Sequence, residues 1–185
     1  MSNKAFIKEF LKKKKMIGSV VPSSKFLSKK MLDHLDFSSA EFVVELGPGT
    51  GVFTDRIIEK LGKDTTLLVI ELNDTFYKDL NNRITDKRVH IRKGSASDLQ
   101  KFMNELNVDQ ADFIVSSLPL AMIPDILRKR IIIEVNAQLN DEGEFIQFQY
   151  SLQSFKLFKK VFNKVSVRPC LFNMPPAFVY SCKKN

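Results

Sequence analysis

The sequence predicts an α/β fold in which a doubly wound, mostly parallel sheet is closed by a C-terminal antiparallel hairpin. From position 41 onward, short apolar runs alternate with amphipathic segments, a pattern typical of parallel strands joined by crossover helices. The first apolar run ends in a glycine-rich turn that leads into a helical pattern. The chain has 185 residues, of which 44% are hydrophobic and 16 are phenylalanine, enough to bury the core of one domain.

Two helices are expected before the sheet. Residues 24–35 have helical spacing with Ser23 or Ser24 as the N-cap, and residues 2–16 form a separate basic helix. We therefore expect residues 1–38 to be a helical appendage, its second helix packing on the core. The main domain would then occupy residues 39–185.

The strands and helices of the main domain follow from its periodicity. We expect parallel strands at 41–46, 66–71, 89–92, 112–117 and 144–150. The connecting helices are expected at 52–61, 74–82, 98–106 and 124–139, the last ending at the turn-forming residues 140–143. A helix at 152–158 and strands at 160–167 and 177–182 complete a sheet of seven strands.

The net charge of +8 lies entirely in the first 30 residues, where nine lysines face Glu9 alone. The rest of the chain is balanced, with 20 basic and 20 acidic residues. Cys170 and Cys182 are too isolated for a disulfide framework or a zinc site, so no metal is expected. No signal peptide and no membrane span are predicted, which indicates an intracellular protein.

The glycine turn favours a nucleoside ligand that lacks a pyrophosphate. Glycines at 47, 49 and 51 let a ligand approach the main chain, and Glu71 ends the next strand at the spacing where a carboxylate reaches ribose hydroxyls. The spacing Gly-x-Gly-x-Gly differs from that of dinucleotide enzymes. The negative charge of Glu45 also suits a cationic group. The alternative is a tight structural connection without a ligand.

Five segments together carry a resemblance to known enzymes. Residues 45–51, Glu-Leu-Gly-Pro-Gly-Thr-Gly, resemble motif I of class I methyltransferases, including the rRNA adenine dimethylases. With segments 18–24, 116–120, 147–150 and 173–177, and behind a basic helix, the chain is similar to the bacterial phospholipid N-methyltransferases, which methylate phosphatidylethanolamine. This resemblance implies a Rossmann-like class I methyltransferase fold and S-adenosylmethionine as cofactor.

The resemblance also implies which residues bind the cofactor. They come from the glycine turn, the end of the second strand and the loop after the third: Glu45, Gly47, Gly49, Thr50, Gly51, Glu71, Leu72, Ser95, Ala96 and Ser97. Ser95 stands where class I enzymes commonly have an aspartate that binds the adenine amine, and its hydroxyl can still form a hydrogen bond.

The segment 116–120 argues against adenine as the methyl acceptor. Adenine N6-methyltransferases have an Asn or Asp, a Pro and an aromatic residue there, whereas this chain has Ser116 and Leu120. We expect Tyr150 to orient an amine or a headgroup phosphate, assisted by Ser116, Ser117 and Asn173. The alternatives are that Tyr150 is a core tyrosine, that residues 116–120 are only a proline-containing loop, and that residues 173–177 are only a rigid turn before the last strand.

The N-terminal helix is expected to bind an anionic lipid surface. Its lysines and its apolar residues gather on different faces, with two lysines intruding among the latter. The predicted membrane-binding residues are Lys4, Phe6, Lys8, Phe10, Lys12, Lys13, Lys14 and Lys15. Packing on the domain and RNA binding are the alternatives.

The sequence therefore predicts an S-adenosylmethionine-dependent N-methyltransferase that acts on the amine of phosphatidylethanolamine. It would work without a metal, peripherally associated with the inner face of the cytoplasmic membrane. An rRNA adenine N6-methyltransferase and a cofactor-binding protein without turnover are the alternative functions.

Overall fold

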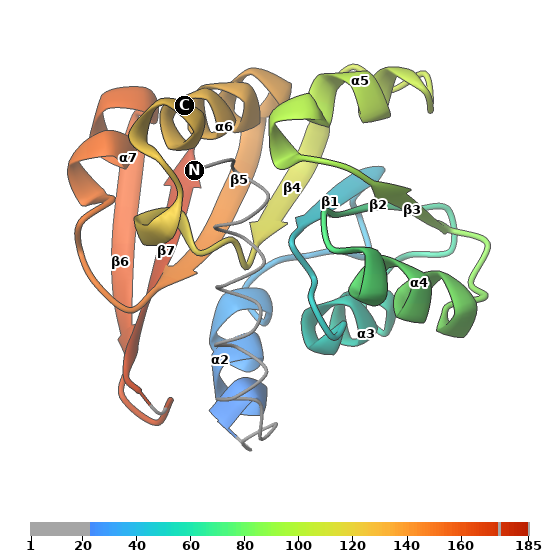
Figure 1. The fold of residues 1–185 in the computed structure, drawn as a ribbon, viewed down its shortest axis with the longest axis horizontal. Coiled ribbons are helices and arrows are strands. Elements are labelled where there is room, and N and C mark those ends of the chain that lie inside the picture. The colour runs from blue at the N-terminus through green and yellow to red at the C-terminus, as the bar shows by residue number, and fades with distance from the viewer. Residues whose placement is uncertain (1–22, 174, 185) are drawn as a thin grey trace.

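A seven-stranded sheet forms the centre of the structure, a computed structural model that describes residues 23–173 and 175–184. Its strand order is β3-β2-β1-β4-β5-β7-β6 (Figure 1). β1 to β5 are parallel, and β7 runs antiparallel to both β5 and β6. The strands are β1 Phe42–Leu46, β2 Thr66–Glu71, β3 Val89–Lys93, β4 Ala111–Ser116, β5 Leu139–Gln149, β6 Lys164–Cys170 and β7 Ala177–Lys183. The predicted fold class is confirmed.

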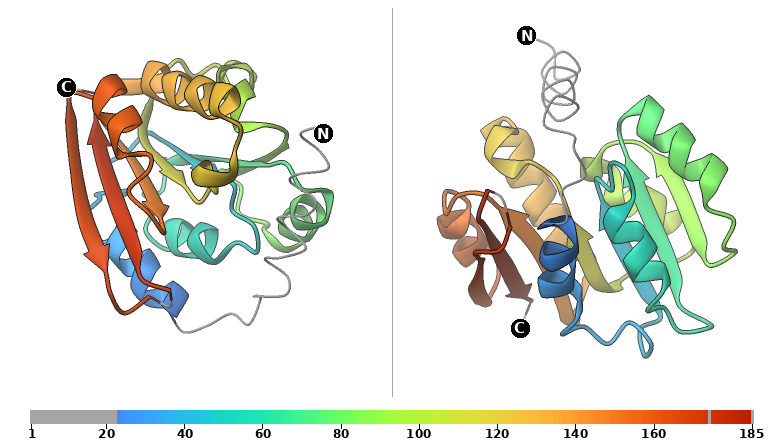
Figure 2. Two further views of the ribbon diagram at one scale, coloured as in Figure 1. Left: turned by 60° about the vertical axis from the view of Figure 1, so that its left-hand side comes forward. Right: turned by 90° about the horizontal axis from the view of Figure 1, so that it is seen from below.

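Helices cover both faces of the sheet. α2, α3 and α4 lie on one face, and α5, α6 and α7 lie on the other (Figures 1 and 2). Their bounds are α2 Ser23–Leu32, α3 Val52–Ile58, α4 Asp74–Arg83, α5 Leu99–Asn104, α6 Asp125–Gln138 and α7 Phe155–Val161. Short 3₁₀ turns, η1 Ala96–Asp98 and η2 Leu120–Met122, follow β3 and β4. No helix of the described residues is long and apolar enough to cross a membrane.

The central strand β1 is buried along its whole length because helices pack on both sides of it. Val44 and Leu46 contribute to the core beneath α5 and α6, whereas Val43 contributes to the core beneath α2 and α3. Leu27 and Met31 of α2 belong to this second core, so α2 is an integral part of the domain.

The predicted turn at 140–143 was wrong, because these residues form the first part of β5. Leu139 pairs with Ala111 of β4, and the register shifts between Ala111 and Phe113. The Asn140 amide also donates a hydrogen bond to Asp112 Oδ1 at 2.6 Å. Pairing with β4 therefore overrides the turn preference of these residues.

The predicted strand at 160–167 was wrong at its start, since α7 extends to Val161 and β6 begins at Lys164. Phe158 and Phe162, spaced four residues apart, have ring centroids 6.4 Å apart, and both contact Phe145 of β5. A helical arrangement brings both rings to the same side of the chain, which explains the later start of the strand.

Several other predicted helix boundaries differ from those of the structure by only a few residues. The helix expected at 52–61 ends at Ile58, and that expected at 98–106 begins as a 3₁₀ turn and ends at Asn104. The helix expected at 24–35 ends at Leu32. Residues 2–16, with the predicted membrane-binding residues, lie outside the described residues.

Candidate cofactor and acceptor site

The glycine turn between β1 and α3 adopts a conformation that only glycine takes without strain. Gly47, Gly49 and Gly51 have φ angles of 68°, 61° and 86°. A Cβ atom added to Gly47 would lie 2.8 Å from Leu118 Cδ2, and one added to Gly51 would lie 2.6 Å from Leu80 Cδ2. A side chain at position 47 or 51 would therefore clash, and the glycines present bare main chain at the carboxyl end of β1.

The Glu45 carboxyl is fully buried directly before this turn. Neither of its oxygens has a hydrogen-bond partner among the described residues, and the Thr54 hydroxyl faces it without completing a bond. Burial raises the pKa of Glu45 to about 8, and the charges of Glu71 and Asp55 add to the rise that Thr54 opposes. A buried carboxyl without a partner suits a ligand that brings a cation or a hydrogen-bond donor.

Glu71 connects the glycine turn to the start of α4. Its Oε2 accepts a hydrogen bond from the Gly49 amide at 3.0 Å, and its Oε1 accepts one from the Asn73 amide at 2.7 Å. Each carboxylate oxygen retains a second lone pair, so the side chain can still accept hydrogen bonds from a diol. Next to it, Leu72 is 42% exposed. Thr50 in the turn is also exposed.

The loop after β3 lies beside Glu71, because the Gly94 amide donates to the Glu71 carbonyl at 3.0 Å. Ser95 caps the 3₁₀ turn η1 by accepting from the Ser97 amide at 3.2 Å, and the two serine hydroxyls are 2.9 Å apart. Ala96 between them is buried. The predicted cofactor residues are thus brought together along one edge of the sheet, where β1, β2 and β3 end.

The segment after β4 is held by glutamines of β5. Gln147 and Gln149 both donate to the Leu118 carbonyl, at 3.1 and 3.2 Å. Ser116 Oγ accepts from the Leu118 amide at 3.3 Å, and Ser117 Oγ is buried without a partner among the described residues. Both predicted serines therefore lie at this edge but are buried. The two glutamines lie in the segment 147–150, and their alternate spacing, which places them on one face of the strand, is the signal that could have identified this role.

Tyr150 and Asn173 meet at the end of β5, although 23 positions separate them in the sequence. Phe178 of β7 pairs with Gln149, so the loop between β6 and β7 returns to the carboxyl end of β5. Burial raises the pKa of the Tyr150 hydroxyl, and a hydrogen bond with the Asn173 side chain opposes this rise. Asn173 is itself buried and donates to the Pro175 carbonyl at 2.6 Å.

All the predicted cofactor and acceptor residues thus lie where parallel strands end, the edge at which open α/β sheets bind ligands. In the described part of the chain, no three His, Cys, Asp or Glu side chains are placed to hold a metal ion.

Comparison with known proteins gives three kinds of similarity. The model of the family described as ribosomal RNA adenine dimethylase matches residues 3–138. An ornithine lipid N-methyltransferase of Singulisphaera acidiphila is 30% identical over 180 residues, covering 96% of this chain and 94% of that protein. A ribosomal RNA small subunit methyltransferase A of Ureaplasma parvum is 28% identical over 139 residues, covering 70% of this chain and 49% of the relative. This chain therefore spans about half the length of that relative.

Solved structures show the same fold at low sequence identity. A Burkholderia thailandensis 1,6-didemethyltoxoflavin-N1-methyltransferase superposes with a TM-score of 0.75 at 15% identity, covering 98% of this chain and 88% of the other. The 16S rRNA N2 G1207 methyltransferase of T. thermophilus gives a TM-score of 0.68 at 18% identity, with 91% and 44% covered.

Proposed function

We propose that this chain, which belongs to the ribosomal RNA adenine dimethylase family and is an S-adenosylmethionine-dependent methyltransferase, transfers methyl groups to the primary amine of phosphatidylethanolamine. Family membership gives the reaction class and the cofactor, and the choice of a lipid amine as acceptor is our proposal. The near full-length similarity to an ornithine lipid N-methyltransferase supports a lipid acceptor.

The observation that carries the choice of acceptor is that the segment after β4 has neither an exposed aromatic ring nor a free Leu118 carbonyl with which to bind a base. Leu120 is fully buried in the core under α6, so this segment offers no aromatic ring on which a base can stack. The Leu118 carbonyl already accepts two hydrogen bonds, which occupy both of its lone pairs. These features argue against a flipped adenine and leave Tyr150 and Asn173 as the polar groups nearest the end of β5.

The residues along the cofactor edge fit S-adenosylmethionine, which when bound supplies a methyl group already activated on a sulfonium. We assign the buried Glu45 carboxyl to the cationic methionine portion and the free lone pairs of Glu71 to the ribose. Leu72 and Ala96 would pack on the adenine, and Ser95 would hydrogen-bond to it. Gly47, Gly49, Thr50, Gly51 and Ser97 complete the proposed set.

Tyr150 and Asn173 are proposed to orient the lipid amine. The Tyr150 ring is held by an edge contact to Phe148, with ring centroids 5.7 Å apart, and the Asn173 side chain opposes the rise that burial causes in the pKa of the Tyr150 hydroxyl. An aromatic face at this position also stabilises the methylammonium that forms. Ser116 and Ser117 would support the acceptor side from the adjacent strand. Positioning of donor and amine accounts for most of the rate gain in such a displacement.

We further propose that residues 1–38 comprise a basic N-terminal helix and a second helix, α2, which packs on the core of the methyltransferase domain at 39–185. The eight predicted membrane-binding residues between Lys4 and Lys15 would attach it to the anionic inner face of the cytoplasmic membrane.

The test offers three acceptors side by side with labelled cofactor: phosphatidylethanolamine vesicles containing anionic lipid, ornithine lipid in the same vesicles, and 16S rRNA. We expect labelled phosphatidylethanolamine. Tyr150→Phe and Asn173→Ala should each lower kcat at least tenfold while cofactor affinity is retained, and Tyr77→Phe on α4 serves as the matched control. Labelled rRNA without labelled lipid would establish the rRNA adenine activity instead. Cofactor binding without any labelled acceptor would indicate a protein without turnover.

A further inference from the structure

Large apolar side chains that are exposed on the described residues gather at the edge where the site lies. Of nine such side chains, only Ile133 lies midway along a helix; the others follow strands at their carboxyl ends, begin α6, or face the loop after β6 from α2. They are Phe26, Leu72, Met122, Ile126, Tyr150, Leu152, Leu171 and Phe172. Such clustering on one side of a domain marks an interaction surface.

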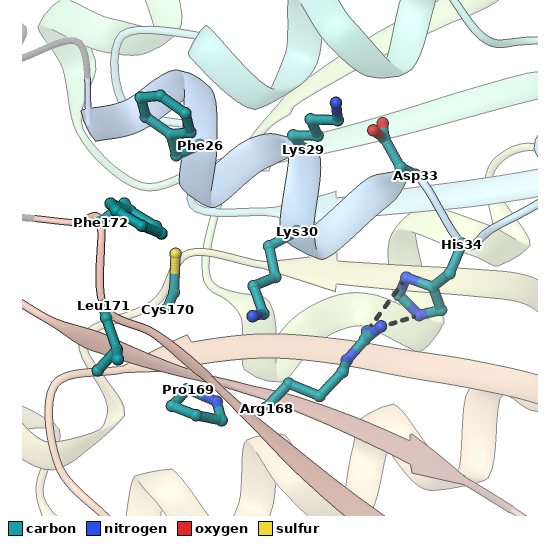
Figure 3. A pocket seen from close by; sticks show the side chains of 10 residues that line it. All are labelled: Phe26, Lys29, Lys30, Asp33, His34, Arg168, Pro169, Cys170, Leu171 and Phe172. Atoms are coloured by element: carbon teal, nitrogen blue, oxygen red, sulfur yellow. Dashed lines mark hydrogen bonds between the residues drawn. The ribbon is translucent and has the colours of Figure 1, made fainter.

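The most exposed part of this edge is an apolar knob made of Phe26, Leu171 and Phe172. These side chains are 56%, 72% and 83% exposed. The rings of Phe26 and Phe172 face each other with centroids 6.2 Å apart, so α2 and the loop after β6 form one projection (Figure 3). The next residue of that loop is Asn173, so the knob adjoins the proposed acceptor position.

Basic side chains line the groove that runs back from the knob. The groove encloses about 700 Å³ between α2 and β6, and Lys29, Lys30 and Arg168 contribute to its lining. The one carboxylate among its described lining residues, Asp33, already pairs with Lys60 at 3.2 Å, whereas Lys29 and Lys30 form no ion pair with any described residue. Arg168 contacts the ring of His34 at 3.0 and 3.1 Å, and its Nε is buried without a partner within the described chain.

We propose that this knob and groove dock the protein on an anionic phospholipid bilayer, with the knob inserted among the acyl chains and the basic side chains at the level of the phosphates. The proposal rests on the lipid acceptor proposed above and assigns the docking surface to the catalytic domain. It is separate from the lysine-rich segment before residue 23.

Charge and spacing both favour a bilayer as the occupant. Lys29 and Lys30 follow Phe26 by three and four residues, which sets them roughly 4.5 to 6 Å farther along the helix axis. An interfacial element buries its apolar side about 5 to 10 Å into the boundary between headgroups and acyl chains, so the spacing matches the depth of the phosphates. The chain's own segment before residue 23 carries six lysines and one glutamate, so its net positive charge is not complementary to a basic groove.

The chain contains no tryptophan, so a single introduced indole reports on its own surroundings. In Phe172→Trp, vesicles of phosphatidylcholine and phosphatidylglycerol should shift the indole emission to shorter wavelength, and brominated acyl chains should quench it. The matched control is Ile133→Trp, at an exposed apolar position midway along α6, whose emission should not change. If the vesicles bind the protein while the indole at position 172 keeps its emission, docking uses another surface and the proposal fails.

Affinity measurements separate the apolar and basic contributions. Leu171→Ser with Phe172→Ser should weaken binding to these vesicles about a hundredfold, near tenfold for each exposed apolar side chain, whereas Ile133→Ser should leave it unchanged. Lys29→Glu with Lys30→Glu should weaken the dependence on phosphatidylglycerol, while the lysines before residue 23 keep their own share of it. Unchanged thermal unfolding midpoints show that each variant is folded.

The vesicles contain no phosphatidylethanolamine, so docking is measured independently of turnover. Insertion without methyl transfer to phosphatidylethanolamine would uphold the docking surface and overturn the proposed acceptor. Methyl transfer in detergent micelles without insertion into vesicles would do the reverse. A shift of the indole emission with 16S rRNA, and none with vesicles, would assign the surface to nucleic acid and overturn the proposal.

Discussion

Replacing Glu45 by glutamine should change the pH dependence of stability in a way that follows from its burial. The pKa of this carboxyl rises from 4.5 to about 8 in the folded protein. Below pH 4.5 the folded and unfolded states are both protonated. Above it the unfolded state ionises while the folded state keeps its proton, so the wild type loses about 1.4 kcal/mol of stability per pH unit up to the folded pKa.

Between pH 5.5 and 7.5 this loss amounts to about 3 kcal/mol. Glu45→Gln has no titrating group at this position and avoids the loss, so its stability relative to the wild type should increase by that amount. Urea unfolding of both proteins at three pH values gives the difference, in which the contributions of all other groups cancel. Glu41→Gln, the same substitution at an exposed glutamate just before β1, is the control.

The same carboxyl should release a proton when the cofactor binds. With a pKa of about 8 it is mostly protonated at pH 7, and a cation placed beside it favours the ionised form. Isothermal titration at pH 7 in buffers of different ionisation enthalpy should therefore show release of about one proton by the wild type and none by Glu45→Gln. A stability difference that is constant with pH, together with no proton release, would refute the assignment of Glu45.

Three further predictions concern the glycine turn, the segment after β4 and His34, which follows α2. Gly51→Ala places a Cβ at a φ of 86° and should cost about 1 to 3 kcal/mol in urea unfolding. Gln149→Ala removes one of the two donors to the Leu118 carbonyl, so kcat should fall while the cofactor Kd from titration stays constant. Burial by itself raises the pKa of Glu144, but hydrogen bonds, first among them that from His34, hold this pKa below its usual value. The ionised Glu144 therefore stabilises the folded protein, and this stabilisation is lost as the pH falls. His34→Ala should flatten the loss of stability on the acid side, and an unchanged acid profile would contradict this role.

The placement of the proposed cofactor residues at one edge of the sheet could be predicted from sequence, because these residues are close together in the chain and have distinctive types. The turn from Gly47 to Gly51 needs left-handed backbone, which few residues other than glycine adopt, and Glu71 follows from the repeat length of one strand-helix-strand unit. What sequence did not reveal is the state of Glu45. Its protonation depends on full burial between two helical layers, which is a property of the assembled sheet.

The acceptor side depends on pairing between distant strands, and there the sequence was less informative. Residues 140–143 have turn preferences, yet pairing with β4 draws them into β5. The contact of Tyr150 with Asn173 exists because β7 inserts between β5 and β6, an order that no local pattern encodes. The sequence allowed candidate acceptor residues to be chosen by residue type, but it did not predict which residues would lie next to one another.

Because β7 lies between β5 and β6, the residues proposed for the methyl donor and those proposed for the acceptor come from different parts of the chain. The proposed cofactor residues come from the contiguous stretch between β1 and η1, whereas Asn173 of the proposed acceptor side comes from the loop between β6 and β7, far along the chain. Under the proposed assignment, changes in that loop should alter which amine is accepted and leave the residues proposed for the methyl donor in place. If Asn173 orients the amine as proposed, exchange of the β6–β7 loop between relatives should transfer the preference for one acceptor.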